Sequence, residues 1–191
     1  KCVRAKATKV YDYRTIETGP KKGDKFEVEI PTSIIGSIEF KNSAVIQFFL
    51  SFDVINHQRN HIELYGTKGS MIVPDPNMFG GSVFSSYSES GEWKEYSSSN
   101  MLIGKTNIFN KSVRSNEQPE VANYRGVGLS EMIDAIENKR TNRCNGELSL
   151  HVLDMIDSTI NAAINGAEQD LRTNCARPMV FSENEIKQLM K

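Results

Sequence analysis

The sequence has almost no net charge and no long apolar run. Among its 191 residues, Lys and Arg number 23 and Asp and Glu number 24, which leaves a formal net charge of -1. Nucleic acids and anionic membranes bind to strongly basic surfaces, so neither is an expected partner. The longest apolar run, residues 44–50, is much shorter than the roughly 20 residues that a membrane helix needs. We therefore expect no membrane-spanning segment.

Cysteine is also scarce. The three cysteines, Cys2, Cys144 and Cys175, are far apart and have no paired spacing. Such a set is more typical of a reducing compartment than of a disulfide framework, which favours the cytoplasm. The chain begins at Lys1 without a Met or an apolar signal core, and residues 2–7 already have the pattern of a strand. The sequence therefore predicts a part of a longer protein.

The composition that is present, 38% hydrophobic and 25% charged, is typical of a folded globular protein. The length predicts a single domain over residues 1–191. The first half of the chain alternates apolar and polar residues, as half-buried strands do. Run 44–53 is richest in aromatic and β-branched residues, so we expect it at the centre of a sheet. The predicted strands are residues 3–13, 26–30, 34–40, 44–53, 61–65, 70–73, 83–87 and 93–96.

After this β-rich region, residues 1–96, the pattern changes twice. Residues 97–120 are rich in Ser, Asn and Lys and predict a long surface connection, which we expect to be less ordered than its flanks. Residues 121–191 have helical periodicity. The predicted helices are 129–136, 147–165 with Gly166 as its C-terminal cap, and a short helix that begins at the capping box Ser182–Glu185.

Strands followed by helices predict an α+β fold. We expect an open, antiparallel-rich mixed sheet with helices packed on one face. The other face of such a sheet needs a cover, which predicts a homo-oligomer formed through the sheet face.

Two short motifs are candidates for chemistry. Gly126 and Gly128 precede a predicted helix, as in a dinucleotide-binding loop, but Glu131 replaces the third glycine and no strand comes before them. A turn followed by a helix is the simpler interpretation. Asp53 and His57 are four apart at a predicted strand end, where period two puts both on one face and a carboxylate can orient an imidazole. A polar strand end is the simpler interpretation here too.

The other polar residues have structural interpretations. His57 and His61 lack a third clustered ligand, so no metal site is expected. We expect His151 to bond to a backbone or carboxylate group on its helix. The expected solvated helix charges are Asp154, Asp157 and Glu168, and the expected helix-dipole charges are Arg140 and Arg143. The residues alone therefore give no complete catalytic constellation.

A resemblance carries the interpretation further. Residues 61–81, HIELYGTKGSMIVPDPNMFGG, resemble a segment in the C-terminal domain of the Gfo/Idh/MocA oxidoreductases, the glucose-fructose oxidoreductase and inositol dehydrogenase family. Residues 124–132 and 146–154 resemble the closing helices of that family. Further matches, in the same order along the chain, are Pro31–Thr32, Ser51–Asp53, Ala135–Ile136 and Arg177–Pro178.

The resemblance implies a parent dehydrogenase with two domains. An N-terminal Rossmann domain would bind NAD or NADP, and the C-terminal sheet domain would form the substrate wall and the oligomer interface. The family's glycine-rich loop, Glu-Lys-Pro motif and Asp-x-x-x-His helix would all lie before Lys1. Asp53 and His57 have the same Asp-x-x-x-His spacing, but no glycine precedes them as in the family's helix. We therefore do not transfer the catalytic role of that motif to them. We assign no catalytic, cofactor-binding or metal residue to this chain, and expect it to be inactive alone.

If the parent acts on a sugar or polyol, polar groups at loops and sheet edges would contact the substrate. The substrate-facing candidates are Asn56, His57, Asn77, Tyr124 and Arg125. Two of them also have structural interpretations, because Asn77 can shape the turn 74–77 and Arg125 can brace a helix start. The alternative function is a non-catalytic dimerisation or ligand-binding module.

Overall fold

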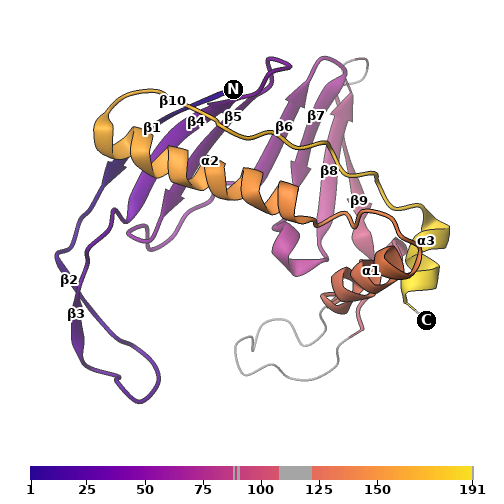
Figure 1. Cartoon of the computed structure of the whole chain (residues 1–191), viewed down its shortest axis with the longest axis horizontal. Helices are drawn as coiled ribbons and strands as arrows, with labels where there is room; N and C mark the ends of the chain where they lie inside the picture. The colour runs from indigo at the N-terminus through magenta and orange to yellow at the C-terminus, as the bar shows by residue number, and fades with distance from the viewer. Residues whose placement is uncertain (88, 90, 108–121, 191) are drawn as a thin grey trace. The chain divides into compact units, whose positions relative to one another are not determined.

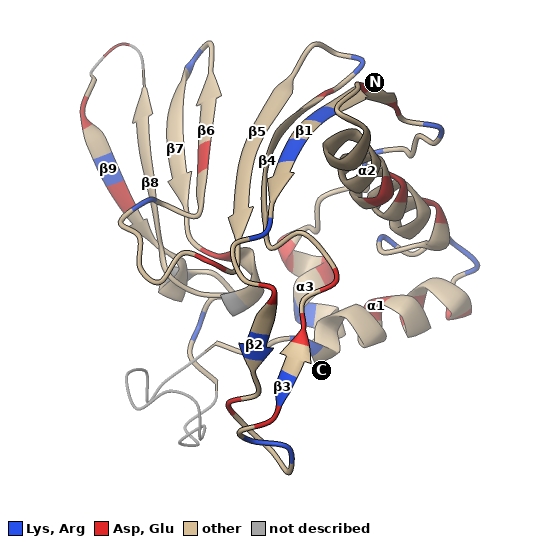
Figure 2. Ribbon diagram, turned by 90° about the vertical axis from the view of Figure 1, so that its left-hand side faces the viewer, with Lys and Arg blue, Asp and Glu red and all other residues tan. Residues whose placement is uncertain are grey.

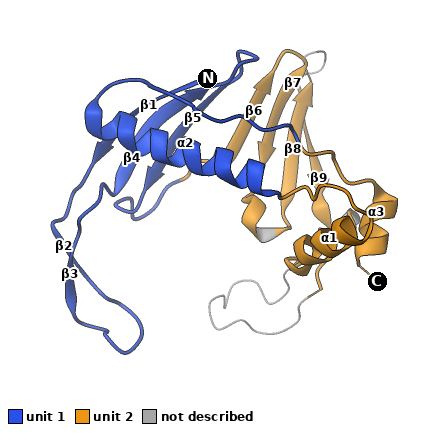
Figure 3. Cartoon of the chain, in the orientation of Figure 1, with its two compact units in different colours: residues 1–57, 145–177 blue, residues 58–144, 178–191 orange. Residues whose placement is uncertain are grey.

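The computed structural model describes residues 1–87, 89, 91–107 and 122–190. The chain divides into two compact units, each built from two separate stretches (Figure 3). Unit 1 contains residues 1–57 and 145–177, and unit 2 contains residues 58–144 and 178–191. Strands in both units pair antiparallel, and α helices accompany them. The predicted α+β class is confirmed, with the strands divided between separate sheets.

Unit 1 has a four-stranded sheet in the order β10–β1–β4–β5. These strands are Gln169–Asp170 (β10), Cys2–Thr8 (β1), Ser33–Glu39 (β4) and Val45–Ser51 (β5). The prediction that residues 44–53 form a central strand is wrong, because β5 is at the edge of the sheet that the described residues form. Aromatic and β-branched residues suit any strand with a covered face, so composition does not fix strand order.

The helix α2 (Gly146–Asn165) lies across one face of this sheet, against β1 (Figure 1). Along β1, Val3 is fully buried and Ala5 and Ala7 are half-buried, whereas Arg4 and the alternate residues after it are exposed. Because side chains alternate between faces, the helix covers the face of Val3. The buried residues of α2 include Ser158 and Ala162, whose small side chains allow close approach.

Local signals set both ends of α2, and the one at its C-terminal end was predicted. At its start the Asn145 side chain accepts a hydrogen bond from the backbone N–H of Leu148, at 2.9 Å. At its end Gly166 adopts the left-handed conformation, with φ 66°. The predicted helix over residues 147–165 is confirmed.

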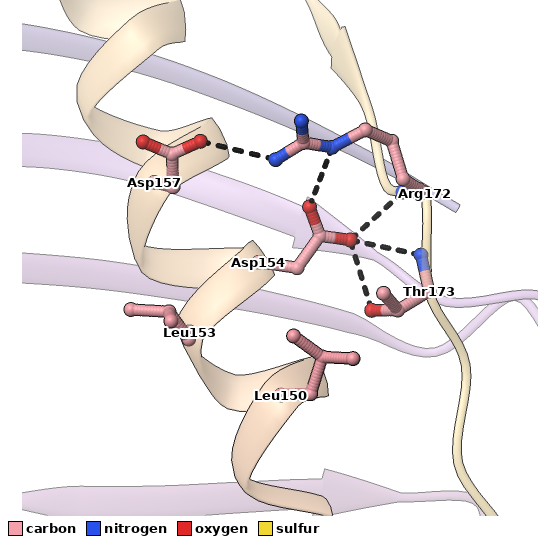
Figure 4. Close-up of a pocket in the computed structure, with 6 residues that line it drawn as sticks. All are labelled: Leu150, Leu153, Asp154, Asp157, Arg172 and Thr173. Atoms are coloured by element: carbon pink, nitrogen blue, oxygen red, sulfur yellow. Dashed lines mark hydrogen bonds and ion pairs between the residues drawn. The ribbon is translucent and has the colours of Figure 1, made fainter. Parts of the chain in front are cut away.

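Asp154 ties α2 to the chain segment after β10. The prediction that it is a solvated helix charge is wrong, since its side chain is 3% exposed. Its carboxylate accepts the backbone N–H groups of Arg172 (2.8 Å) and Thr173 (2.9 Å), the Thr173 hydroxyl (2.9 Å) and Arg172 Nε (3.1 Å), as Figure 4 shows. Burial raises the pKa of Asp154, but the hydrogen bonds from Thr173 and Arg172 outweigh it and lower the pKa to about 2.

A two-stranded ribbon connects β1 to β4 in unit 1 (Figure 1). Its strands are Tyr13–Thr15 (β2) and Lys25–Glu27 (β3), so the predicted strand 3–13 is divided between β1 and β2. The ribbon is anchored where Arg14 Nη2 donates to Asp53 Oδ1 (2.6 Å) and to the carbonyl oxygen of Phe52 (2.9 Å).

Unit 2 has a second four-stranded sheet whose strands follow one another in chain order. They are Ile62–Gly66 (β6), Gly69–Val73 (β7), Ser82–Tyr87 (β8) and Trp93–Ser97 (β9), which confirms the strands predicted over residues 61–65, 70–73, 83–87 and 93–96. A 3-10 helix, η1 (Pro76–Met78), lies between β7 and β8, and another, η2 (Ser98–Asn100), follows β9. Residues 108–120 of the predicted surface connection lie outside the described residues.

Unit 2 also contains α1 (Gly126–Glu137) and α3 (Glu183–Leu189), which contact each other. Glu131 of α1 is buried and pairs with Arg140 (2.6 Å) and Arg143 (3.2 Å). Arg143 also pairs with Glu185 of α3 (2.7 Å), next to the predicted capping box, which is present. The two arginines thus neutralise a buried carboxylate, a role beyond the expected effect on a helix dipole.

Replacing Asp154 by Asn tests the anchor of α2. At neutral pH we expect Asp154→Asn to lower the Tm by several degrees, because the amide loses the charge and turns an N–H group toward other donors. The folded-state pKa of about 2 is below the ordinary value of 3.8, so the stabilisation is complete above about pH 4 and is lost as the pH falls through about 2. The Tm difference between the two chains should therefore shrink over that range in thermal unfolding.

Asp157→Asn is the matched control, because it removes the same charge from the same helix. The side chain of Asp157 is 53% exposed, and its one bond among the described residues is to Nη2 of Arg172, at 3.1 Å. We expect a much smaller change in Tm. Equal losses in the two variants would show that Asp154 is not the anchor.

Candidate functional site

Three of the five substrate-facing candidates lie together in unit 2. Arg125 is directly before α1, and its Nη2 donates to the backbone carbonyl oxygen (3.0 Å) and to Oδ1 (2.7 Å) of Asn77. Asn77 belongs to η1, whose turn is fixed because the Asp75 carboxylate accepts the backbone N–H of Asn77 at 2.9 Å. The fold thus joins two polar residues that are 48 positions apart in the sequence.

Phe79 completes the group, which we call the arginine platform: Asn77, Phe79, Tyr124 and Arg125. The guanidinium carbon of Arg125 lies 5.9 Å from the centre of the Phe79 ring. The centre of the Tyr124 ring lies 6.1 Å from the centre of the Phe79 ring. Tyr124 is 9% exposed, and its hydroxyl donates to the carbonyl oxygen of Lys105 at 2.8 Å. This buried tyrosine supports the ring beneath the guanidinium.

Phe79 has an uncommon backbone conformation. Its φ of 56° lies in the left-handed region, which is strained for an aromatic residue. The contacts with Tyr124 and Arg125 help to hold it there. Phe79 is not among the residues predicted from the sequence. The available signal was its place before Gly80 and Gly81, a pair that indicates a tight turn.

The arginine platform is suited to binding rather than to proton transfer. Arg125 is exposed, and its Nε and Nη1 have no hydrogen-bond partner among the described residues. The Tyr124 hydroxyl already donates to a carbonyl group within the protein. An oriented guanidinium can donate to hydroxyl, carbonyl or carboxylate oxygens of a small ligand.

The other two candidates, Asn56 and His57, belong to unit 1. Both are exposed, in the segment after β5. The structure therefore gathers Asn77, Tyr124 and Arg125 in one place and leaves Asn56 and His57 in a different unit.

The predicted strand-end pair of Asp53 and His57 is wrong in its geometry. β5 ends at Ser51, so Asp53 follows the strand and the alternation of faces no longer applies to it. Its carboxylate accepts the hydroxyls of Thr32 (2.6 Å) and Ser33 (2.7 Å) in addition to Arg14. The bonds from Thr32 and Ser33 lower the pKa of Asp53, which makes it an ionised anchor of the ribbon.

Unit 1 also has a pocket beside α2, with a volume of about 410 Å³ (Figure 4). Arg172 pairs there with Asp154 and Asp157, at 3.1 Å in each case. His151, expected to bond to a backbone or carboxylate group, instead has Nδ1 2.8 Å from the hydroxyl of Thr173. The polar groups of this pocket are bonded to one another, which favours a structural role. Its lining residues are Leu150, Leu153, Asp154, Asp157, Arg172 and Thr173.

The described part of the chain lacks the features of three other kinds of site. No group of three or more His, Cys, Asp or Glu side chains there is placed to hold a metal ion. Neither α2 nor any other described helix has the length and apolar character that a membrane span requires. Gly126 begins α1 without a strand in residues 122–125, and the third-glycine position is the buried, paired Glu131.

The fold is similar to those of several solved oxidoreductases. One is an oxidoreductase from Agrobacterium radiobacter in complex with NAD+, L-tartaric acid and magnesium, at 13% identity and a TM-score of 0.59, with 89% of this chain and 43% of that chain covered. A second is levoglucosan dehydrogenase in complex with NADH and L-sorbose, at 16% identity and a TM-score of 0.62, covering 90% and 45% of the two chains. A third is the aldose-aldose oxidoreductase from Caulobacter crescentus complexed with glycerol, at 16% identity and a TM-score of 0.56, covering 89% and 41%.

The chain spans less than half the length of these proteins. No curated protein sequence matches it. A family model described as "Oxidoreductase family, C-terminal alpha/beta domain" matches residues 7–171, which is most of the chain. The chain therefore belongs to the Gfo/Idh/MocA oxidoreductase family, as its C-terminal alpha/beta domain.

Proposed function

We propose that this chain is the substrate-binding and oligomerisation domain of an NAD- or NADP-dependent dehydrogenase. The substrate of the parent enzyme would be a sugar, a polyol or a similar hydroxy or carbonyl compound. The observation that carries this proposal is the family match over residues 7–171. The complexes of similar proteins with NADH and L-sorbose and with glycerol support the classes of cofactor and substrate.

The arginine platform is the proposed part of the substrate wall. Arg125 is held by Asn77 and has further donors without a partner among the described residues, as a residue that positions hydroxyl or carbonyl groups should. Asn56 and His57 remain further candidates. The protein's share in hydride transfer is to orient substrate and nicotinamide, and we assign the nucleotide-binding and catalytic residues to a separate domain of the parent.

The oligomerisation role rests on exposed apolar side chains. On the face of the unit 1 sheet opposite Val3, Ile35 pairs across strands with Phe49, and they are 60% and 54% exposed. Val45, on the same face, is 58% exposed, and β5 has no charged residue (Figure 2). We name Ile35, Val45 and Phe49 the open sheet face. Exposed apolar side chains of this kind are typical of a contact with another protein copy, and Lys6, opposite Ile35, and Glu39, opposite Val45, lie on the same face.

The thiols of the chain bear on the cell compartment that we propose for the protein. Cys2, Cys144 and Cys175 are all free in the structure. Free thiols at three separated positions support a reducing compartment such as the cytoplasm.

The oligomerisation role predicts self-association of the chain. We expect a dimer or larger assembly at tens of micromolar in sedimentation velocity. Phe49→Glu should weaken association at least tenfold, because it places a charge in the contact. Val10→Lys is the control, since Val10 is equally exposed, at 61%, but follows β1 and lies outside the open sheet face. A monomeric chain, or equal effects of the two variants, would contradict this role.

Because we assign the nucleotide-binding and catalytic residues to a separate domain of the parent, we predict that the chain alone neither binds a nicotinamide cofactor nor transfers hydride. In scanning fluorimetry with millimolar NAD or NADP we expect no rise in Tm. A ligand at 100 times its Kd would add about 2.7 kcal/mol and a clear rise. If a rise occurred, Gly126→Val would test the glycines in the first turn of α1, and Gly146→Val, at the start of α2, would be the matched control. Each of these glycines has open space around an added Cβ. A rise that only Gly126→Val abolishes would place cofactor binding in this chain.

A further inference from the structure

Arg125 differs from the other arginines that the fold positions. In the described part of the chain, five arginines form ion pairs with carboxylates. Arg125 is instead held by two uncharged oxygens of Asn77 and by the face of the Phe79 ring. Its positive charge is therefore oriented but not neutralised by an ion pair among the described residues. The five paired arginines are Arg4, Arg14, Arg140, Arg143 and Arg172.

The closest acidic residue in the turn sequence, Asp75, has another role. Its carboxylate caps η1 by accepting the backbone N–H of Asn77 at 2.9 Å. No ion pair joins Asp75 to Arg125 in the described part of the chain. The Asp75 carboxylate thus shapes the turn, and the neutral oxygens of Asn77 hold the guanidinium of Arg125.

The platform beneath Arg125 is held from several sides. Phe79 keeps an uncommon left-handed φ of 56°, and its ring contacts both the guanidinium and the Tyr124 ring. Tyr124 is buried and bonded to the Lys105 carbonyl group. Conformational strain in an aromatic residue persists where neighbouring contacts over-determine it, and such places are enriched at ligand sites. Three donors, one on Nε and two on Nη1, have no hydrogen-bond partner among the described residues.

We propose that Arg125 binds a carboxylate of the substrate, so that the parent enzyme acts on a sugar acid or related hydroxy acid in preference to a neutral sugar or polyol. This inference rests on the proposed substrate-binding function of the chain. A single unneutralised guanidinium matches the single charge of a carboxylate, and charge-assisted hydrogen bonds are stronger than neutral ones. A phosphate ester, with a charge of about -1.5 to -2, favours a cluster of cationic groups, and Arg125 is a single one.

The test compares ligands of matched shape with the complete 191-residue chain. Gluconate is compared with sorbitol, and galacturonate with galactose. Each ligand is titrated into the chain, and its Kd is obtained from the shifts of the NMR signals of unit 2. We expect each acid to bind about tenfold more tightly than its neutral partner, and this preference to fall as salt is raised from low to high concentration.

Two variants separate the charge from the contacts. Arg125→Gln should weaken the binding of gluconate and galacturonate far more than that of sorbitol and galactose, and so abolish the preference for acids. Asn77→Asp keeps the arginine and the shape of the turn but supplies an internal carboxylate, so it should also abolish the preference. Arg177→Gln is the control, because Arg177 is an exposed arginine outside the platform. Circular dichroism and Tm confirm that each variant is folded.

The outcomes distinguish this inference from the function on which it rests. Equal binding of acids and neutral partners, or a preference that survives both variants, would overturn the carboxylate assignment and leave the substrate-binding role intact. A stronger response to glucose 6-phosphate than to gluconate would also overturn it. Binding of neither class by the chain would remove the proposed substrate-binding role itself.

Discussion

The buried carboxylate of Asp154 is the interaction on which unit 1 depends. A charged group excluded from water is stable only when donors surround it, and its donors come from Arg172 and Thr173. These two residues follow β10, β10 pairs with β1, and β1 lies against the helix that carries Asp154. The helix α2, the strands β1 and β10 and the segment after β10 therefore stabilise one another. The loss of any of them would leave the Asp154 carboxylate without its hydrogen-bond donors. Glu131 has the corresponding role in unit 2, where Arg140 and Arg143 surround it.

The sequence predicted well those features that depend on neighbouring residues. The strands of unit 2, the Gly166 end of α2 and the capping box at Ser182 all follow from signals a few positions long. The failures involve distant partners. Asp154 is bonded to residues 18 and 19 positions away, and Glu131 to one 12 positions away, so neither burial is visible in the helical period. β5 has the composition of a central strand, but its place at the edge depends on which strands pair with it, and in the described part of the chain that strand is β4.

The candidate site shows the same division. Residue chemistry and the family resemblance selected Asn77, Tyr124 and Arg125, and the fold brings these three together across 48 positions. Phe79 was missed because an apolar side chain gives no polar signal and its left-handed backbone is a property of the folded turn. Asp53 and His57 were paired by a strand period that stops at Ser51, two residues too early for the argument to hold. A regular repeat can place side chains only as far as the element continues.

Because the two units are interleaved along the chain, the sheet that begins first during synthesis is not the first to be completed. β1 is translated near the start of the chain, but the helix that covers it, α2, and its outer neighbour, β10, are translated about 150 residues later. Until then the ribosome-bound chain has β1, β4 and β5 as an uncovered apolar sheet, whereas the four consecutive strands of unit 2 can pair soon after they emerge. Unit 2 should thus acquire its sheet while unit 1 is still incomplete. The nascent chain is then most dependent on chaperones during the interval before residues 145–177 leave the ribosome.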